Sequence, residues 1–213
     1  MSRFAILLGG DLTVTPRLRA QLKGARFIAA DSGMMHAASL GIVPELWVGD
    51  FDSAGSELTM QYRDVPRETF PAEKDATDGA IAVAEAIWRG ASEILLIGGL
   101  GGQADHTTGL LGQSIAIVKS GVPCLVTSGN EEAVPVISGS TMLDLQADTR
   151  LSIIPFSDLE GLDLEGVKWP LVNRAVPLGS TLTLSNVALG RVSIRLRAGY
   201  GIAISYPAFD PND

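Results

Sequence analysis

The chain has 213 residues, of which 46% are hydrophobic and 19% are charged, and its formal net charge is -8. This composition is typical of a well-packed globular protein and excludes a largely disordered chain. The acidic balance and the lack of Lys and Arg clusters exclude a nucleic-acid partner, because phosphate backbones are bound through such clusters. A negatively charged protein can still bind ATP when the nucleotide arrives with its metal ion.

The first apolar run is five residues long and leads directly into Gly9-Gly10-Asp11, which is too soon for a signal peptide or a membrane span. We therefore expect a cytoplasmic protein without a membrane partner. The single cysteine, Cys124, lies within an apolar run. An intramolecular disulfide is excluded, and we expect this thiol to be buried.

Up to about residue 128, short apolar runs alternate with helical patterns. Strands are expected at residues 4–8, 26–30, 46–48, 93–97 and 123–127, with a weaker one at 68–70. Helices are expected at residues 16–24, 33–40, 79–89 and 107–120. The third helix would have Ile81, Ala84 and Trp88 on one face. Strands separated by helices predict right-handed crossovers and a largely parallel sheet.

The pattern changes after residue 130. Short alternating runs follow at residues 141–145, 150–154, 181–184, 192–196 and 202–206, and glycine- or serine-containing turns separate them. This is the pattern of an all-β sandwich or barrel. We predict an N-terminal Rossmann-like, largely parallel α/β domain over residues 1–130 and a smaller C-terminal β-sandwich domain over residues 131–213.

Acidic residues gather at the ends of the apolar runs and before one helix. The four clusters are Asp31, then Asp50 with Asp52, then Asp75 with Asp78, and Asp105 with His106. Open α/β sheets bind ligands outside the carboxyl ends of their strands, so all four clusters are expected to face one crevice. Crowded carboxylates need a cation, and their hard oxygens suit Mg²⁺ that carries substrate phosphates. The chemistry indicated is metal-assisted phosphoryl or pyrophosphoryl transfer.

The GDFDS segment at residues 49–53 has two readings. In an extended chain Asp50 and Asp52 project to the same side and can hold one or two metal ions together. Alternatively, the segment is a polar turn in which Asp52 caps the next element. The motif by itself leaves both readings open.

The segment KDATD at residues 74–78 precedes the helix expected at 79–89. Plain helix capping by Asp75 or Thr77 explains it without any ligand. The functional reading places Asp78 on a metal ion and Lys74 on phosphate oxygens at the same helix end.

The segment GGLGGQADH at residues 98–106 is a glycine-rich turn between a strand and a helix. Its glycines permit positive φ and close backbone approach to a ligand, although ordinary tight turns use glycine as well. His106 is either a ligand contact or a capping or core histidine, whereas His36 is expected to be structural.

Taken in order, these segments resemble the thiamine pyrophosphokinase family. The resemblance rests on ADSG at residues 30–33, PELWVGDFDS at 44–53, KDATD at 74–78 and GGLGGQADH at 98–106. In the second domain it rests on GVKWPL at 166–171 and GSTLTLSN at 179–186. It covers nearly the whole chain, and the ordered set is far more specific than any one motif.

The resemblance implies an enzyme that transfers the pyrophosphoryl group of ATP to the hydroxyl of thiamine, giving thiamine diphosphate and AMP. It implies a homodimer whose active site lies between the α/β domain of one subunit and the β-sandwich of the other. The implied assignments are Asp50, Asp52 and Asp78 for Mg²⁺; Asp31 and Asp105 for the rest of the acidic crevice; Lys74, Asp75, Thr77 and His106 for ATP; and Ser185 and Asn186 for thiamine.

The chain departs from the family pattern at three positions. It has Ser32 where glycine is usual, Gln103 where arginine is usual, and Leu110 near a usual asparagine. Two other functions fit the same motifs. One is a related pyrophosphokinase that acts on a pterin alcohol, and the other is a catalytically silent protein that binds nucleotide or thiamine.

Overall fold

The computed structural model describes residues 2–51, 55–70 and 75–207, and the chain forms two compact units. The first unit contains residues 1–110 and 122–129, and the second contains residues 111–121 and 130–213. Each unit has its own apolar core, and the helix over residues 104–119 contributes residues to both units.

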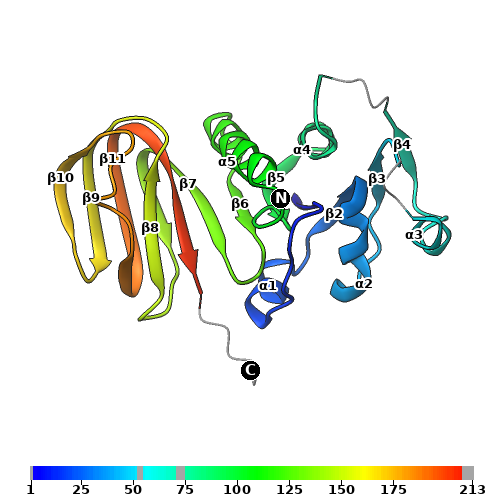
Figure 1. Cartoon of the computed structure of the whole chain (residues 1–213), viewed down its shortest axis with the longest axis horizontal. Coiled ribbons are helices and arrows are strands. Elements are labelled where there is room, and N and C mark those ends of the chain that lie inside the picture. The colour runs from blue at the N-terminus through cyan, green and yellow to red at the C-terminus, as the bar shows by residue number, and fades with distance from the viewer. Residues whose placement is uncertain (1, 52–54, 71–74, 208–213) are drawn as a thin grey trace. The chain divides into compact units, whose positions relative to one another are not determined.

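The first unit is built on a parallel sheet (Figure 1). Its strands are β1 (Ser2–Leu7), β2 (Arg26–Ala30), β3 (Leu46–Gly49), β4 (Arg67–Thr69), β5 (Ala91–Ile97) and β6 (Cys124–Thr127). Their order in the sheet is β6-β5-β1-β2-β3-β4. The chain builds one side of the sheet from β1 to β4 and then returns to the other side for β5 and β6. The strand order therefore reverses between β1 and β5, the kind of position at which such sheets bind ligands.

Helices cover both faces of this sheet. They are α1 (Pro16–Gln21), a 3₁₀ helix η1 (Asp31–Met35), α2 (His36–Leu40), α3 (Ser56–Gln61), α4 (Asp78–Trp88) and α5 (Ala104–Lys119). One core joins α1, α2 and alternate residues of the sheet, including the fully buried Trp47. Helix α4 packs against β1, β2, β3 and β5 and lies on the opposite side of the sheet from α1 and α2 (Figure 1). No helix among the described residues is long and apolar enough to cross a membrane.

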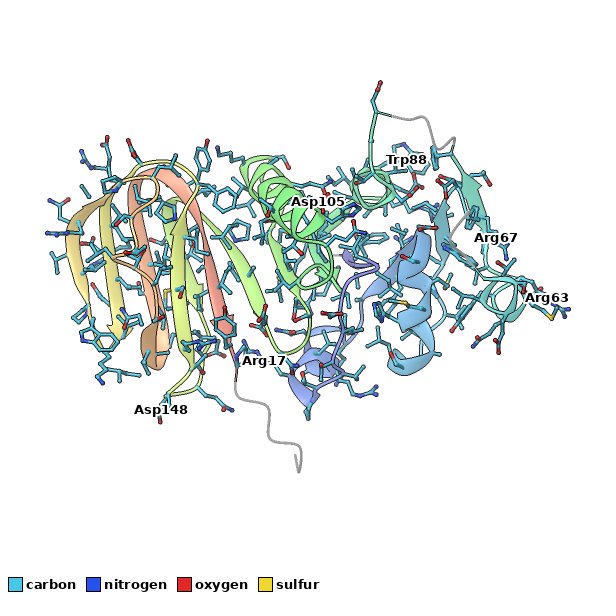
Figure 2. The ribbon with its side chains drawn as sticks, viewed as in Figure 1. Arg17, Arg63, Arg67, Trp88, Asp105 and Asp148 are labelled. Atoms are coloured by element: carbon cyan, nitrogen blue, oxygen red, sulfur yellow. The ribbon has the colours of Figure 1, made fainter. Side chains whose placement is uncertain are left out.

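The predicted face of α4 is wrong. Trp88 is 79% exposed (Figure 2), whereas Ala82, Val83 and Ala86 are buried. Almost every residue of this helix is apolar, so hydrophobic periodicity did not single out a face, and the small side chains pack on the sheet. Two other helices begin earlier than expected. The 33–40 helix begins with η1 at Asp31, and the 107–120 helix begins at Ala104.

The second unit is antiparallel and is organised by one long strand. Its strands are β7 (Glu132–Leu143), β8 (Arg150–Pro155), β9 (Leu159–Val167), β10 (Leu171–Val176) and β11 (Asn186–Tyr206). The first part of β11 pairs mainly with β9 and the last part with β8, and β7 accompanies both parts. Its register with β7 shifts between Leu196 and Tyr200, next to Gly199 with φ of 101°. The five strands enclose one apolar core.

The expected fold class, an N-terminal α/β domain followed by a strand-rich C-terminal domain, is confirmed. The strand expected at residues 181–184 is wrong, because these residues form a turn. Thr183 is buried and donates its hydroxyl to Ile153 O at 2.6 Å, while Leu182 and Leu184 are exposed. The threonine is buried and the leucines are exposed, which is the opposite of the burial that the expected strand would have. Strands β9 and β10 and helix α3 were not predicted.

Candidate active site

The candidate site is the edge of the first sheet at which its parallel strands end. Strands β1, β2, β3 and β5 end there at Leu7, Ala30, Gly49 and Ile97. Asp31 and Asp50 each follow a strand directly. The expectation that acidic residues gather at this edge rests on sheet geometry, and the described strand ends have that geometry.

Asp31 and the end of β3 are close neighbours. A Cβ atom added at Gly49 would lie 3.2 Å from the Asp31 Cα atom, so a side chain at Gly49 would crowd the Asp31 backbone. Trp47 also reaches across from β3, and its Nε1 donates to the Asp31 carbonyl oxygen at 2.9 Å. The backbone at Asp31 and the backbone just before Asp50 are therefore in close contact.

Two glycine turns pack together beside them, after β1 and after β5. Gly10 N donates to Gly98 O at 3.0 Å, and a Cβ atom at Gly98 would lie 2.6 Å from Leu8 O. The His36 ring closes the arrangement, because its Nε2 donates to Gly10 O at 2.9 Å. Gly98 has φ of 71°. Close approach and positive φ both require glycine here, and His36 has the structural role expected of it.

This pair of turns contains a residue that sequence reasoning missed. A Cβ atom at Gly101 would lie 2.5 Å from Asp11 Oδ2, so the Asp11 carboxylate lies against the turn after β5. The signal was present in the sequence as a glycine pair and an aspartate directly after the first apolar run. It was read only as the end of that run.

Helix α4 begins at the same edge. A Cβ atom at Gly79 would lie 2.9 Å from Leu8 Cδ2, which puts the first turn of α4 against the end of β1. Thr77 is the N-cap, and its Oγ1 accepts from Ala80 N at 3.2 Å. Asp78 lies in the first helical turn. The capping reading of Thr77 is correct, and its hydroxyl proton can still be donated to a ligand.

The first turn of α5 carries Asp105 (Figure 2) and His106, both exposed. Asp105 Oδ1 accepts from His106 N at 2.9 Å, and Thr107 Oγ1 donates to Gly101 O at 2.8 Å. Of the alternatives left open for His106, a core histidine is excluded because the residue is exposed.

Within the GDFDS segment, Phe51 has φ of 65°, so the backbone is not extended at that residue, whereas the shared-face reading of this motif requires an extended backbone. Asp52 and Lys74 lie outside the described residues. Asp75 is described and is exposed.

Whether the acidic edge can bind Mg²⁺ is judged from the type of donor atoms that its residues offer. In residues 2–51, 55–70 and 75–207, no three His, Cys, Asp or Glu side chains are close enough to hold a metal ion. Asp31 and Asp50 directly follow strands that end at this edge, and Asp78 lies in the first turn of α4. Their carboxylate oxygens are the kind of ligand that Mg²⁺ prefers, so these residue types fit the metal.

In the second unit, Asn186 is the first residue of β11 and Ser185 directly precedes it, so neither residue ends a strand. The Asn186 side chain is buried and binds the backbone of Trp169 on both sides. Its Oδ1 accepts from Trp169 N at 3.2 Å and from Val187 N at 2.9 Å, and its Nδ2 donates to Trp169 O at 2.8 Å. Trp169 itself is 53% exposed. Ser185 is exposed and has φ of 59°.

The structure describes the surroundings of the three residues that depart from the family pattern, Ser32, Gln103 and Leu110. A Cβ atom at Gly9 would lie 2.3 Å from Ser32 Oγ, so the Ser32 hydroxyl covers that glycine. A Cβ atom at Gly99 would lie 2.5 Å from Leu110 Cδ2, so the Leu110 side chain covers this glycine in the same way. Gln103 is exposed, just before α5.

Comparison with known proteins identifies the class. Residues 20–126 match the family model of the thiamin pyrophosphokinase catalytic domain, and residues 141–200 match that of the thiamin pyrophosphokinase vitamin B1 binding domain. These two matches, in this order along the chain, assign it to the pyrophosphokinases. The chain belongs to the thiamine pyrophosphokinase family.

Individual relatives agree with this assignment. Thiamine pyrophosphokinase of Bacillus subtilis is 31% identical over 195 residues, which is 87% of this chain and 89% of the relative. A crystal structure of thiamine pyrophosphokinase from Bacillus subtilis superimposes with a TM-score of 0.86 at 27% identity, covering 98% of this chain and all of that one. A family member from Enterococcus faecalis gives a TM-score of 0.82 at 25% identity, covering 97% and 100%.

Proposed function

We propose that the protein transfers the pyrophosphoryl group of ATP to the hydroxyl of thiamine. The thiamine hydroxyl oxygen attacks the β-phosphorus, the bond from that phosphorus to the α,β-bridging oxygen breaks, and AMP leaves. The hydroxyl proton is released, and the products are thiamine diphosphate and AMP. The observation that carries the proposal is that the chain matches, in order, both the catalytic and the vitamin B1 binding regions of one family.

Residues 1–130 are proposed as the ATP- and metal-binding domain, and residues 131–213 as the thiamine-binding domain. The family-model matches at residues 20–126 and 141–200 support this division. Catalysis comes mainly from positioning and charge neutralisation, because phosphoryl transfer needs little covalent help from the protein.

Asp50, Asp52 and Asp78 are proposed as the residues that hold Mg²⁺, with Asp31 and Asp105 completing the acidic edge. Bound Mg²⁺ supplies charge neutralisation on the phosphate oxygens. The adjoining backbones of Asp31 and Gly49 and the approach of α4 to Leu8 support this grouping for its described members.

ATP phosphates are proposed to meet the start of α4, with Lys74, Asp75 and Thr77, and the start of α5, with His106. Helix N-termini present free N–H groups and a partial positive charge to anions. Lys74 would add a cation to the nucleotide phosphates.

Thiamine is proposed to bind at the start of β11, at Ser185 and Asn186. The side-chain oxygen and nitrogen of Asn186 already bind the protein backbone, so its contribution runs through the placement of Trp169. An exposed indole held in this way offers a flat surface to a heteroaromatic ring.

The working unit is proposed to be a homodimer in the cytoplasm, where ATP is abundant and a single buried thiol stays reduced. Supporting the dimer, the second unit exposes Leu178, Leu182, Leu184 and Leu189 at 62%, 50%, 43% and 63%. Four exposed leucines within residues 178–189 are compatible with an interaction surface. Mixing an Asp78→Asn chain with a Ser185→Ala chain tests whether a site draws residues from both subunits, because exchange would then restore some activity.

The experiment that tests the function is incubation with ATP, Mg²⁺ and thiamine, with identification of both products. Thiamine diphosphate and AMP in equal amounts support the proposal. Faster conversion of a pterin alcohol would identify the other pyrophosphokinase, and ligand binding without AMP release would identify a silent binding protein.

A further inference from the structure

Two turns at the acidic edge contain residues in the left-handed backbone region. Asp31 has φ of 43°, and Phe51, which follows Asp50, has φ of 65°. Residues with a Cβ atom are disfavoured there by about 1–2 kcal/mol, and the surrounding structure must hold them in place. The contacts that do so also decide where the backbones of Asp31 and Asp50 lie.

Trp47 links the two turns. Its indole Nε1 donates to the Asp31 carbonyl oxygen at 2.9 Å. Its ring packs edge-on against the Phe51 ring, with centroids 5.0 Å apart and planes at 87°. Trp47 is fully buried, whereas Asp31 and Phe51 are half-buried, so both contacts start from a side chain that the core holds in place.

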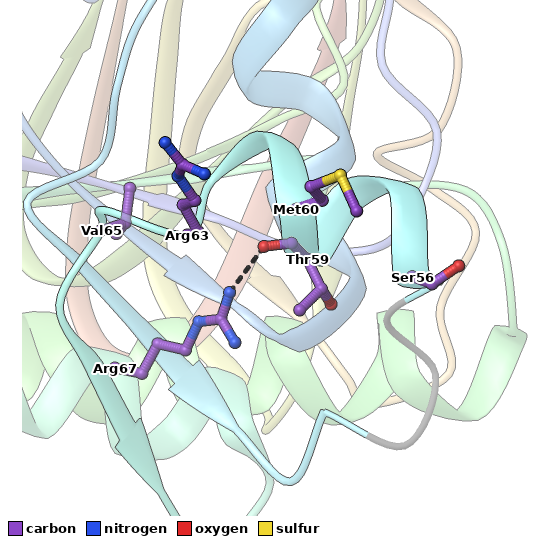
Figure 3. Close-up of a pocket in the computed structure, with 6 residues that line it drawn as sticks. All are labelled: Ser56, Thr59, Met60, Arg63, Val65 and Arg67. Carbon is purple, nitrogen blue, oxygen red and sulfur yellow. Dashed lines mark hydrogen bonds between the residues drawn. The ribbon is translucent and has the colours of Figure 1, made fainter.

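Arg67 lies over the two rings from the neighbouring strand. It is the register partner of Trp47 in the β3–β4 pair. Its Cζ atom is 4.9 Å from the centroid of the Trp47 ring and 5.5 Å from that of Phe51. Its guanidinium donates to Thr59 O in α3 at 2.8 Å (Figure 3). One cation therefore joins α3, β3 and the turn after Asp50.

Arg67 lies at the surface and can be replaced without changing a buried residue. It is exposed and lines an open depression of about 760 Å³ together with Arg63. Figure 3 shows the two arginines on either side of the chain that connects α3 to β4. Arg63 makes a distant, exposed ion pair with Asp64 at 3.8 Å. It is a matched control, because it is an exposed arginine of the same depression whose ion pair is with its own neighbour in the sequence.

We propose that Trp47, Phe51 and Arg67 are positioning residues that set metal affinity at the acidic edge. They touch neither substrate nor metal, and they act by holding the Asp31 and Asp50 backbones in their left-handed turns. Removal of the cation leaves the turns free to relax, and the carboxylates then bind the metal less tightly. The presence of a metal ion at this edge rests on the proposed function, whereas the contacts among Trp47, Phe51 and Arg67 do not depend on it.

The test uses the full chain and Mn²⁺ alone as the probe, with free Mn²⁺ measured by its electron paramagnetic resonance signal. Arg67→Met should weaken Mn²⁺ binding about fivefold, a change in keeping with the loss of a partly exposed cation–π contact. Arg67→Lys keeps a cation over the rings and should recover most of that loss. Arg63→Met should bind Mn²⁺ as the wild type does, and the thermal unfolding of all three variants should stay close to wild type.

A second readout is Trp47 fluorescence in a Trp88→Phe, Trp169→Phe background, which leaves Trp47 as the one tryptophan of the sequence. Mn²⁺ or Mg²⁺ should change its emission, and Arg67→Met should shift that change to higher metal concentration. Equal Mn²⁺ affinity of wild type and Arg67→Met, or no saturable Mn²⁺ binding in the wild type, overturns the proposal. Failure of the proposed function is seen separately, as an absence of thiamine diphosphate from wild-type protein whose Mn²⁺ affinity still depends on Arg67.

Discussion

Replacement of Asn186 by alanine should impair thiamine use while leaving ATP use unchanged. The buried carboxamide makes three hydrogen bonds of 2.8 to 3.2 Å, two of them to the backbone of Trp169. Each is worth about 1 kcal/mol net, so the variant should lose about 2–3 kcal/mol of unfolding free energy. If about 1.4 kcal/mol of this energy is lost from thiamine binding because Trp169 is no longer held in place, the KM for thiamine rises about tenfold.

The assay is steady-state kinetics with each substrate varied in turn, together with urea unfolding. Ser180→Ala is the control, because it removes one hydrogen bond to Leu182 N from a turn of the same unit and should change neither KM. An Asn186→Ala, Trp169→Ala double variant should lose less than the sum of the single variants, since both act through one indole. Additive losses, or an unchanged thiamine KM in a destabilised Asn186→Ala protein, would refute the reasoning.

Three further outcomes are expected. Gln103→Arg restores the usual family cation beside the phosphates and should lower the KM for ATP several-fold, and an unchanged or higher KM would contradict this role. Burial opposes ionisation of Glu45, but its bonds to Arg26 and Arg89 outweigh that effect and hold the pKa of Glu45 below its ordinary value of 4.5. Its contribution, at most about 1 kcal/mol for such a partly exposed pair, is therefore present above pH 4.5 and lost as the pH falls through the lower folded-state pKa. The free energy of unfolding of Glu45→Gln should therefore lie below that of the wild type above pH 4.5, and the two values should converge at lower pH. A difference between the two proteins that grows on acidification would contradict the sign of this effect. Burial raises the pKa of Cys124 to about 12, so a thiol reagent should label it slowly in the native protein and quickly in denaturant; rapid native labelling would contradict its burial.

The first unit was largely predictable because most of its strands end in a buried apolar run. Residues 27–30 and 94–97 are apolar without interruption and are followed by Asp31 or by glycine. Parallel-sheet geometry then places the strand ends at one edge without further information. Helix α3 was missed because it has no side-chain N-cap and no buried residue, whereas the equally short α1 begins with Thr15 and Pro16.

The second unit was harder because its strands are half exposed. Strand β9 reads LEGLDLEGV, and its glycines and acidic residues resemble a loop although Leu162 and Leu164 are buried. The TLTL run at residues 181–184 alternates as a strand does, yet it buries Thr183, whose hydroxyl is satisfied by Ile153 O. Hydrophobic alternation alone cannot reveal that partner.

Long-range contacts decided the details of the site. The sequence indicated Asp31 and Asp50 from their place after strands, but not that Trp47 would join their turns. It indicated Asn186 as a ligand residue, but not that the Asn186 carboxamide would bind the backbone of Trp169, seventeen residues earlier. Such pairings depend on register between strands, which local patterns do not contain.

The most direct test of the central claim is the fate of labelled phosphate. Two reactions with thiamine and Mg²⁺ are run in parallel, one with ATP labelled at the γ-phosphate and one with ATP labelled at the α-phosphate. Pyrophosphoryl transfer predicts that the γ label appears in thiamine diphosphate and the α label in AMP, and that Asp78→Asn abolishes both. A γ label in thiamine monophosphate with release of ADP, or no label in any thiamine product, would contradict the account.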